Sequence, residues 1–337
     1  MIPHNRPTLG PAEAQAAADA ILSNNVAGGP HVKALEQELC QWLGLPEGGA
    51  ALVSSGTAAL FVALHVSGGR GRRIAMPAYA CSALRNAAAM IGAQSTLLDC
   101  APQNPNVDLK ALAGADCEFA IVPHMYGIPV DTKPLQASMT IIDDAAQALG
   151  ARTGGRAAGC TGRVGVLSFY ATKLITTGGM GGAVISEDGA LMDEVRDFLD
   201  FDCRRDERDR FNFKLSDPQA AVGREQLKRL HSFLERRAEI FSAYAATGVP
   251  MLGTDLAPAS ERVAYRAIVR TNRPDKMISH LRTCGISAIV PTQEWELPDG
   301  DFPEALKLAR STVSLPIYPS LKDDDVRLIV ESLQSAA

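Results

Sequence analysis

The chain has 337 residues and a net charge of −5; 46% of the residues are apolar and 21% are charged, as in ordinary soluble globular proteins. This length suits a large domain accompanied by a smaller one. The acidic balance, with no basic cluster among aromatic residues, argues against a nucleic-acid partner. No apolar run approaches the length of a membrane span, and the N-terminal residues lack the apolar core of a signal peptide.

Seven cysteines are scattered along the chain and are never spaced as Cys-x-x-Cys. An odd, scattered set predicts reduced thiols in a cytoplasmic protein, and neither a disulfide framework nor a zinc site. We therefore expect no metal in the functional site.

The N-terminal region begins with a Pro-rich stretch, residues 1–10, which we expect to form an extended arm. Apolar residues at helical spacing predict two helices, over residues 11–24 and 31–43, with a break at Gly28-Gly29-Pro30 between them. A short strand is predicted at residues 50–53.

A small polar turn, Ser54-Ser55-Gly56-Thr57, joins that strand to an apolar helix predicted over residues 58–66. A strand, a polar turn and a helix in this order can capture a phosphate, because free backbone N–H groups and the helix dipole point at the anion. Simple N-capping of the helix by Ser55 or Thr57 explains the same residues. The turn alone does not decide between the two.

Strand-like and helix-like segments alternate through the next part of the chain. Strands are predicted at residues 73–76, 95–98, 119–123, 139–142, 164–167 and 183–185, and a helix at residues 82–91. This order predicts an α/β fold whose mainly parallel sheet is flanked by helices. Ligands of such sheets lie beyond the carboxyl ends of the strands. The polar residues at those ends are Ser55, Tyr79, His124, Asp144, Gln147, Ser168 and Lys173.

The stretch from Ser168 to Gly182 holds one lysine, Lys173, followed by four glycines in five positions. Each glycine would cost a helix about 1 kcal/mol relative to alanine, so the run indicates tight bends or close approach to a ligand. A partly desolvated lysine there could act as an amine nucleophile. A surface lysine beside a flexible loop explains this stretch equally well when it is taken alone.

The last third of the chain predicts a small α+β domain. A charge run at residues 204–210 is expected to be a solvated loop or helix end. Helices are predicted at residues 218–227, 229–246, 276–284 and 322–334, and strands at residues 265–270 and 288–290. We therefore expect an N-terminal arm with a large domain over residues 1–228, and a linking helix with a small C-terminal domain over residues 229–337.

An acidic group, an aromatic side chain, a phosphate turn and a lysine at one sheet edge suit pyridoxal 5′-phosphate (PLP). Lysine forms a Schiff base with its aldehyde, and a carboxylate opposite the pyridine nitrogen lets the ring take up carbanion charge. Asp144 is the candidate carboxylate, because the side chain of Asp143 points to the other face of the strand. Tyr79 could lie on the ring face. A helix N-cap at Asp144 and core packing of Tyr79 remain open.

Several motifs occur in one order along nearly the whole chain. The most specific are Asp144-Ala145-Ala146-Gln147, continuing to Ala151, and Ser168-Phe169 with Lys173. The others are Arg6-Pro7 with Gly28-Gly29-Pro30, Ser54-Ser55-Gly56-Thr57, Phe211-Asn212 with Ala220-Ala221, and Leu315-Pro316-Ile317-Tyr318-Pro319. Through these motifs the chain resembles the DegT/StrS-type sugar aminotransferases, PLP-dependent enzymes of fold type I. The resemblance implies an aspartate-aminotransferase-like fold in which residues 1–228 carry the PLP-binding domain.

The resemblance also implies catalytic roles. Lys173 would carry the Schiff base and, once displaced, move the proton between carbon atoms. Asp144 would pair with the pyridinium nitrogen, and Gln147 would contact the ring hydroxyl. Tyr79 would be the aromatic residue that stacks on the ring.

The remaining implied roles concern the cofactor phosphate. The backbone amides of Gly56 and Thr57 and the side chain of Ser168 would hold it. Asn212 would reach the phosphate of the neighbouring subunit, which implies a homodimer with shared active sites.

The chain departs from the family pattern at positions that concern the substrate. Met180 stands in the glycine run where the family usually has an acidic residue, and Tyr265-Arg266 stands where many members have Tyr-His. Arg266 could bind a phosphate or carboxylate of the substrate, or be a surface charge. His124 and Tyr126 could line the substrate side, although a structural histidine is as good an explanation.

The leading functional prediction is a PLP-dependent aminotransferase that moves an amino group, with L-glutamate the expected donor, to a keto sugar that is nucleotide-linked. One alternative keeps the chemistry but changes the acceptor to a cyclic polyol ketone or an aromatic precursor. A dehydratase of the same fold is disfavoured, because that branch replaces the lysine by histidine. A further alternative is a PLP-binding protein without turnover.

Overall fold

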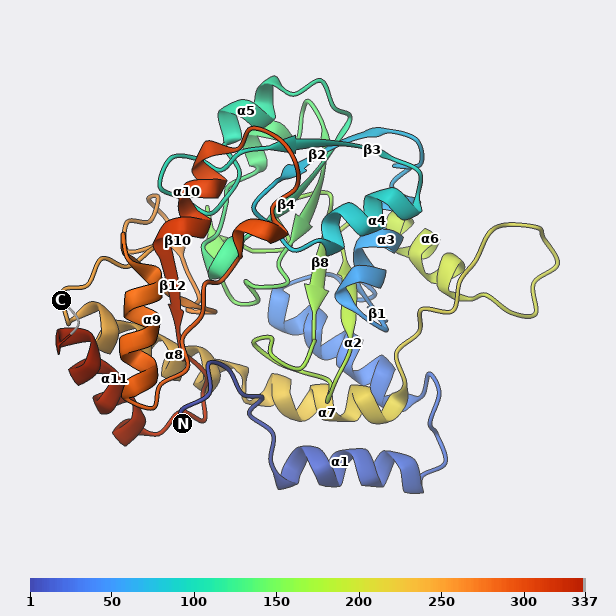
Figure 1. Ribbon diagram of the computed structural model, residues 1–337. Coiled ribbons are helices and arrows are strands. Elements are labelled where there is room, and N and C mark those ends of the chain that lie inside the picture. The colour runs from blue at the N-terminus through green and yellow to red at the C-terminus, as the bar shows by residue number, and fades with distance from the viewer. Residues whose placement is uncertain (336–337) are drawn as a thin grey trace.

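The computed structural model describes residues 1–335, and within them a seven-stranded sheet forms the centre of the protein (Figure 1). Its strands are β1 (Ala50–Val53), β2 (Arg73–Pro77), β3 (Gln94–Leu98), β4 (Phe119–Pro123), β5 (Thr140–Asp144), β8 (Val164–Ser168) and β9 (Gly182–Ile185), in the spatial order β1-β9-β8-β5-β4-β2-β3. Only β9 runs antiparallel, and it does so to both β1 and β8. The predicted mainly parallel sheet is therefore confirmed.

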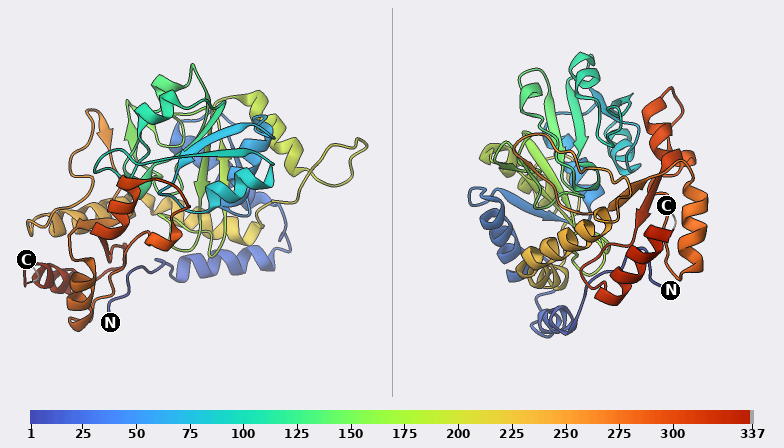
Figure 2. Two further views of the ribbon diagram at one scale, coloured as in Figure 1. Left: turned by 45° about the horizontal axis from the view of Figure 1, so that its top comes forward. Right: turned by 90° about the vertical axis from the view of Figure 1, so that its left-hand side faces the viewer.

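Helices cover both faces of this sheet (Figure 2). One face packs against α3 (Gly56–Val66), α4 (Ala83–Met90) and α6 (Gly189–Leu199), and the other against α2 (Pro30–Leu43), α5 (Leu109–Gly114) and α7 (Asp217–Lys228), with α1 (Pro11–Leu22) packed on α7. The side chains of β1 alternate accordingly: Ala51 and Val53 enter the first core, while Ala50 and Leu52 enter the second. Among the described helices, none combines the length and the apolar character needed to cross a lipid bilayer.

A second, smaller layer lies in the C-terminal part of the chain. The antiparallel strands β11 (Ala267–Arg270) and β12 (Thr312–Leu315) pack against α8 (Leu230–Ala245), α9 (Pro274–Thr283) and α11 (Asp323–Ser335) around their own apolar cluster. The N-terminal arm contributes Ile2 to this cluster. A mixed cluster that includes Tyr79, Met125, Ile268 and Leu308 joins the small layer to the large one.

The structure also differs from the sequence prediction. The strand expected at residues 288–290 is reduced to one bridge between Ile289 and Ser314 of β12, because Pro291 has no N–H to continue the ladder. The elements that were not predicted are α5, α6, α10 (Pro303–Ser311), β12, the short strands β6 (Arg152–Thr153), β7 (Arg156–Ala157) and β10 (Ser260–Glu261), and the 3₁₀ turns η1 (Met125–Gly127), η2 (Lys133–Leu135) and η3 (Glu294–Glu296).

The charge run belongs to a loop over residues 200–216 that projects from the body of the protein between α6 and α7 (Figure 1). Its arginines are not all free in solvent: Arg204 and Arg210 form ion pairs with Asp197 of α6. The run is therefore a loop, as predicted, and is partly tied to the preceding helix.

The Gly28-Gly29-Pro30 break is held by a buried carboxylate at the start of α7. Oδ1 of Asp217 accepts hydrogen bonds from the backbone N–H groups of Gly29 (3.1 Å) and Val32 (2.9 Å), and Asp217 is fully buried. A side chain on Gly29 would collide with this carboxylate, because its Cβ would lie 2.7 Å from Cγ of Asp217. Asp217 thus caps the N-terminus of α2, although it lies far from that helix in the sequence.

Replacing Asp217 by alanine is expected to lower the free energy of unfolding by about 2 kcal/mol, because two buried N–H groups lose their acceptor. Urea denaturation measures this change. Asp324→Ala is a matched control, since the Asp324 side chain is 84% exposed in the first turn of α11. Equal stabilities of the two variants would contradict the capping role.

Candidate active site

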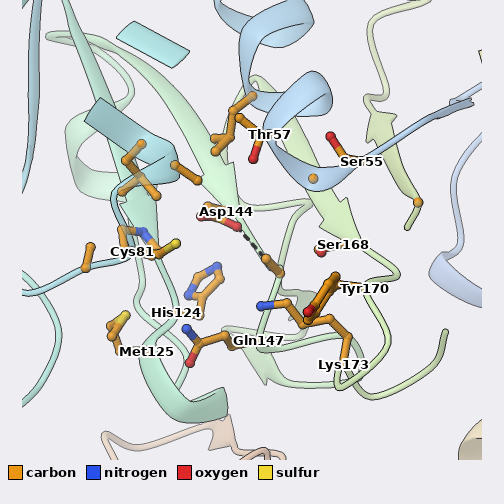
Figure 3. Close-up of a pocket in the computed structure, with 18 of the residues that line it drawn as sticks. Ser55, Thr57, Cys81, His124, Met125, Asp144, Gln147, Ser168, Tyr170 and Lys173 are labelled. Atoms are coloured by element: carbon orange, nitrogen blue, oxygen red, sulfur yellow. Dashed lines mark hydrogen bonds between the residues drawn. The ribbon is translucent and has the colours of Figure 1, made fainter. Parts of the chain in front are cut away.

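A cavity of about 290 Å³ lies at the carboxyl ends of the sheet strands and gathers most of the predicted site residues (Figure 3). Helix α3 begins on one side of it, and the segment carrying Lys173 closes the other. The predicted residues that line the cavity are Gly56, Thr57, Asp144, Gln147, Ser168 and Lys173. Parallel strands bring these residues together because their carboxyl ends share one edge of the sheet.

The turn at the start of α3 offers free backbone donors. Oγ of Ser55 accepts the N–H of Ala58 at 3.0 Å, so Ser55 is the N-cap. Within residues 1–335, the N–H groups of Gly56 and Thr57 donate to no protein acceptor. The N-cap is thus observed, whereas phosphate capture by this turn stays a prediction, which the unpaired N–H groups of a capped helix start allow.

Glycines let the turn, strand β8 and the glycine run approach one another closely. A Cβ on Gly56 would lie 2.8 Å from Cβ of Ser168, and a Cβ on Gly182 would lie 2.6 Å from the carbonyl oxygen of Ser55. Real side chains do not fit at such distances. Gly56 and Gly182 are thus required because a side chain at either position would collide with a neighbouring segment.

The two adjacent aspartates of β5 have different surroundings. Asp144 lines the cavity, and its Oδ1 accepts the N–H of Ala146 at 2.9 Å. Burial raises the pKa of Asp144 above its ordinary value, against the opposing effects of that N–H and of the Lys173 charge. The carboxylate therefore gains from a cationic or N–H partner in the cavity.

Asp143 points to the other side of the strand, as the two-residue period predicts. Its Oδ2 accepts hydrogen bonds from Gly159 N–H, Thr161 N–H and Thr161 Oγ1, and its Oδ1 lies 2.6 Å from Nε2 of His124. Burial alone would raise the pKa of Asp143, but His124 and these hydrogen bonds hold it below the ordinary value. Asp143 is thus a structural carboxylate.

His124 lines the cavity and is completely buried at the end of β4. Its Nδ1 accepts the N–H of Val130 at 2.9 Å, and its Nε2 lies 2.6 Å from Oδ1 of Asp143. Both ring nitrogens are therefore occupied by protein groups. His124 presents its ring to the cavity, but its hydrogen bonds are structural.

Lys173 extends into the cavity from the loop after β8 and lies beside a buried tyrosine. Its Nζ is 5.3 Å from the centroid of the Tyr265 ring. Burial alone would raise the pKa of the Tyr265 phenol, but the charges of Lys173 and Arg266 outweigh it and lower that pKa. The lysine is a lining group of the cavity, and the alternative of a freely solvated surface lysine is not observed.

Gln147 and the turn after β4 form one wall. Oε1 of Gln147 accepts the N–H of Tyr126 at 2.9 Å, which leaves its Nε2 as a donor directed toward the cavity (Figure 3). Tyr126 has a φ of 59°, a left-handed conformation that non-glycine residues seldom adopt. Its hydroxyl bonds that of Tyr79 at 2.8 Å.

Two predicted site residues do not lie at this cavity. Tyr79 is fully buried in an apolar cluster and is absent from the cavity lining, so its position does not suit the stacking role predicted for it. Cys81, two residues further along, lines the cavity instead, and no local pattern in the sequence marks this cysteine as a site residue. Asn212 is exposed on the projecting loop, away from the cavity of its own chain. Met180 lies in the lining with 55% of its surface exposed.

Comparison with known proteins identifies the chain's relatives. It is 31% identical over 357 residues to the dTDP-3-amino-3,4,6-trideoxy-alpha-D-glucose transaminase of Streptomyces venezuelae, with 97% of this chain and 92% of that protein covered. Among solved structures, the aminotransferase TlmJ of Streptoalloteichus hindustanus superposes with a TM-score of 0.91 at 26% identity, covering 100% of this chain and 98% of that one.

A second solved structure is that of S. venezuelae DesV in complex with a ketimine intermediate, with a TM-score of 0.88 at 28% identity over 96% of this chain and 93% of that one. The sequence profile of the DegT/DnrJ/EryC1/StrS aminotransferase family matches residues 7–334, which is nearly the whole chain. The ordered motifs, the sheet and the cavity agree with this match. The chain belongs to the DegT/DnrJ/EryC1/StrS aminotransferase family.

Proposed function

We propose that this protein transfers an amino group from L-glutamate, or another amino acid, to a nucleotide-linked keto sugar, with PLP held at Lys173. The observation that carries the proposal is the meeting of Lys173, Asp144 and the free N–H groups of α3 in one cavity. Each of these groups suits a different part of the cofactor. When bound, PLP supplies an electron sink for the carbanion that forms during amino transfer.

The residues of the cavity fit this cofactor. The N–H groups of Gly56 and Thr57, at the positive end of α3, would hold its phosphate together with Ser168. Asp144 is buried and uses only Oδ1 for its bond to Ala146 among the described residues, so Oδ2 is available to a protonated ring nitrogen.

Lys173 would hold the cofactor covalently through Nζ, which is also the group placed to move the proton between carbon atoms. Gln147 has its Oε1 committed to Tyr126, so its Nε2 would donate to the ring hydroxyl. The buried ring of His124 covers part of the cavity, which helps to exclude water from the reacting atoms.

The nature of the acceptor is inferred from the relatives. The similar S. venezuelae transaminase is named for a dTDP-linked amino sugar, which supports a nucleotide-linked keto sugar as the acceptor of this chain. The cavity opens into a second hollow that is large enough for a substrate bulkier than an amino acid.

Spectroscopy and product analysis test the proposed function. Addition of L-glutamate to PLP-loaded protein is expected to abolish the yellow absorbance. Subsequent addition of a dTDP-linked keto sugar is expected to restore that absorbance. Mass spectrometry should then detect the corresponding dTDP-linked amino sugar. A panel that adds free keto sugars and inososes separates the nucleotide-linked acceptor from a cyclic polyol ketone. Absence of any spectral response to amino donors would leave only a binding protein without turnover.

We also propose a homodimer with shared active sites, on the basis of the family resemblance. The exposed position of Asn212 on the loop over residues 200–216 supports it, because an exposed side chain can contact a second subunit. Light scattering gives the oligomeric state, and an Asn212→Ala variant that retains PLP as firmly as the unaltered protein would contradict the shared site.

A substitution at the phosphate turn tests the cofactor site separately. Gly56→Ala is expected to weaken PLP binding by about tenfold or more, because the new Cβ meets Ser168 at 2.8 Å and must displace the turn. PLP retained after gel filtration, measured by absorbance, reports the change. Gly189→Ala is the control, since a Cβ at this position of α6 has no neighbour within 4 Å. Equal retention by both variants would show that the turn does not hold the phosphate.

A further inference from the structure

A second cavity of about 510 Å³ adjoins the first one and extends toward the small C-terminal layer. The two cavities share Cys81, Gln147, Tyr170 and Lys173 in their linings. A molecule that reacts at Lys173 therefore has direct access to the second cavity. Apart from Gln147 and Lys173, none of the polar and aromatic residues that line this hollow takes part in the proposed cofactor contacts.

The cavity contains an arginine whose charge has no acidic partner. Nη1 of Arg266 lies 3.3 Å from Nε2 of His4 and 3.3 Å from Oγ of Ser314. Burial and the Arg266 charge lower the pKa of His4 to about 3, so His4 is neutral and adds no second positive charge beside Arg266. Among residues 1–335, no carboxylate lies within ion-pair distance of Arg266. This half-buried cation therefore lacks an anion.

Arg266 is also close to the reacting lysine. Cζ of Arg266 lies 5.7 Å from the centroid of the Tyr265 ring, and Nζ of Lys173 lies 5.3 Å from the same centroid. The two cations thus lie near the same tyrosine ring, and both line the second cavity. An anionic group bound by Arg266 would belong to the molecule whose carbon atom reacts at Lys173.

The lining contains a second unpaired guanidinium, that of Arg85 on α4. No carboxylate of the described residues forms an ion pair with it either. Glu296, the one acidic residue of this lining, is exposed and accepts the N–H of Gln293 through its Oε2. Two guanidinium groups from different layers suit an extended anion with several oxygens.

An exposed aromatic side chain completes the lining. Trp295 lies on the 3₁₀ turn η3 and is 81% exposed. A tryptophan this exposed gains nothing from core packing, whereas its flat indole can stack on a planar base. The lining thus provides a reacting lysine, two cations and a stacking surface within connected cavities.

We propose that Arg266 and Arg85 bind the diphosphate of the nucleotide-linked acceptor, and that Trp295 stacks on its base. The proposal rests on the function proposed above and names the residues that select the acceptor. The carboxylates of the amino donor are a second source of anionic oxygens. The diphosphate is favoured for two reasons. The cavity is larger than an amino acid requires, and an amino-acid donor such as glutamate has no planar base on which Trp295 could stack.

Direct binding of dTDP tests the subsite without any turnover. In calorimetric titrations, Arg266→Gln is expected to weaken dTDP binding by about tenfold to a hundredfold, since charge-assisted hydrogen bonds are lost. Arg85→Gln and Trp295→Ala are expected to weaken it by about tenfold each. Arg282→Gln is the matched control, because Arg282 is exposed on α9 and absent from this lining. Unchanged dTDP binding in Arg266→Gln would overturn the proposal.

Half-reactions then separate the two sources of the anion. With Arg266→Gln, the rate of the spectral change driven by L-glutamate is expected to match the unaltered protein, whereas kcat/KM for the dTDP-linked acceptor falls with the loss of dTDP affinity. Loss confined to the glutamate half-reaction would assign Arg266 to the donor and overturn the proposal. Arg266→Lys, which keeps the charge, should recover part of the acceptor activity; a variant impaired only through misfolding would not.

The binding assay keeps the subsite and the proposed function distinguishable. If dTDP binds as expected but no keto sugar is aminated, the subsite stands and the proposed function fails. If dTDP-linked sugars are aminated at the same rate after substitution of Arg266, Arg85 or Trp295, the proposed function stands and the subsite fails. Trp295 fluorescence in a Trp42→Phe background gives a second readout, because the chain has two tryptophans.

Discussion

Lys173→Ala is expected to lower kcat by about a thousandfold or more, because both the covalent attachment of PLP and the proton transfer at Nζ are lost. The variant should also lose the yellow absorbance of the loaded protein, and borohydride should no longer fix PLP to the peptide that contains residue 173. Stopped-flow absorbance and peptide mapping measure these effects. The lysine is half-buried in the cavity lining, so its removal leaves the core intact.

Lys228→Ala is the matched control for this variant. The Lys228 side chain is 58% exposed at the end of α7, where it pairs with Glu225. It should retain activity, absorbance and borohydride labelling. Borohydride labelling of another lysine in the unaltered protein would refute the assignment of Lys173.

Asp144→Asn is expected to lower kcat by about a hundredfold or more, because an amide cannot stabilise a protonated ring nitrogen as a carboxylate does. In the cofactor-free protein, Asp144→Asn should leave the free energy of unfolding unchanged or raise it. The reason is that burial raises the pKa of Asp144, so the charged form destabilises the folded state at neutral pH. Kinetics and urea denaturation at pH 7 test both statements.

The neighbouring residue provides the contrast. Asp143→Asn is expected to lower the free energy of unfolding at neutral pH by about 2 kcal/mol, because the hydrogen bonds from Thr161 and Gly159 are weaker to a neutral amide than to a carboxylate. Because the folded-state pKa of Asp143 lies below its ordinary value of 3.8, its stabilising contribution is present above that pH and is lost as the pH falls further. Equal stability losses in the two variants would contradict their different roles.

The sequence predicted the framework of the site well, for identifiable reasons. Buried strands such as β1 and β4 were located within a residue or less, since apolar runs of four or five residues end at glycine, proline or polar residues. The polar residues after these runs then met at one edge because parallel strands share their carboxyl end. The opposed faces of Asp143 and Asp144 follow from the two-residue period of a strand.

The positions that were missed depend on contacts between distant segments. Tyr79 and Cys81 are two residues apart, and nothing in their local pattern shows that the chain buries the tyrosine against Tyr126 and leaves the cysteine in the cavity. Strand β12 was missed because its pairing with β11 joins residues more than forty positions apart. The sequence did not decide whether Arg266 is a surface charge or binds a ligand, because its surroundings include His4 from the N-terminal arm.

The amino-acid order by itself determined the alternation of strands and helices and the family, and it predicted the lysine–aspartate pair, since these depend on local periodicity and on ordered motifs. The tertiary structure alone decided that Cys81 rather than Tyr79 lines the joined cavities, where the unpaired guanidinium groups lie and which groups bind Asp143. The physical reason is that burial, charge pairing and close approach are properties of segments brought together by packing. They do not exist along an isolated stretch of chain.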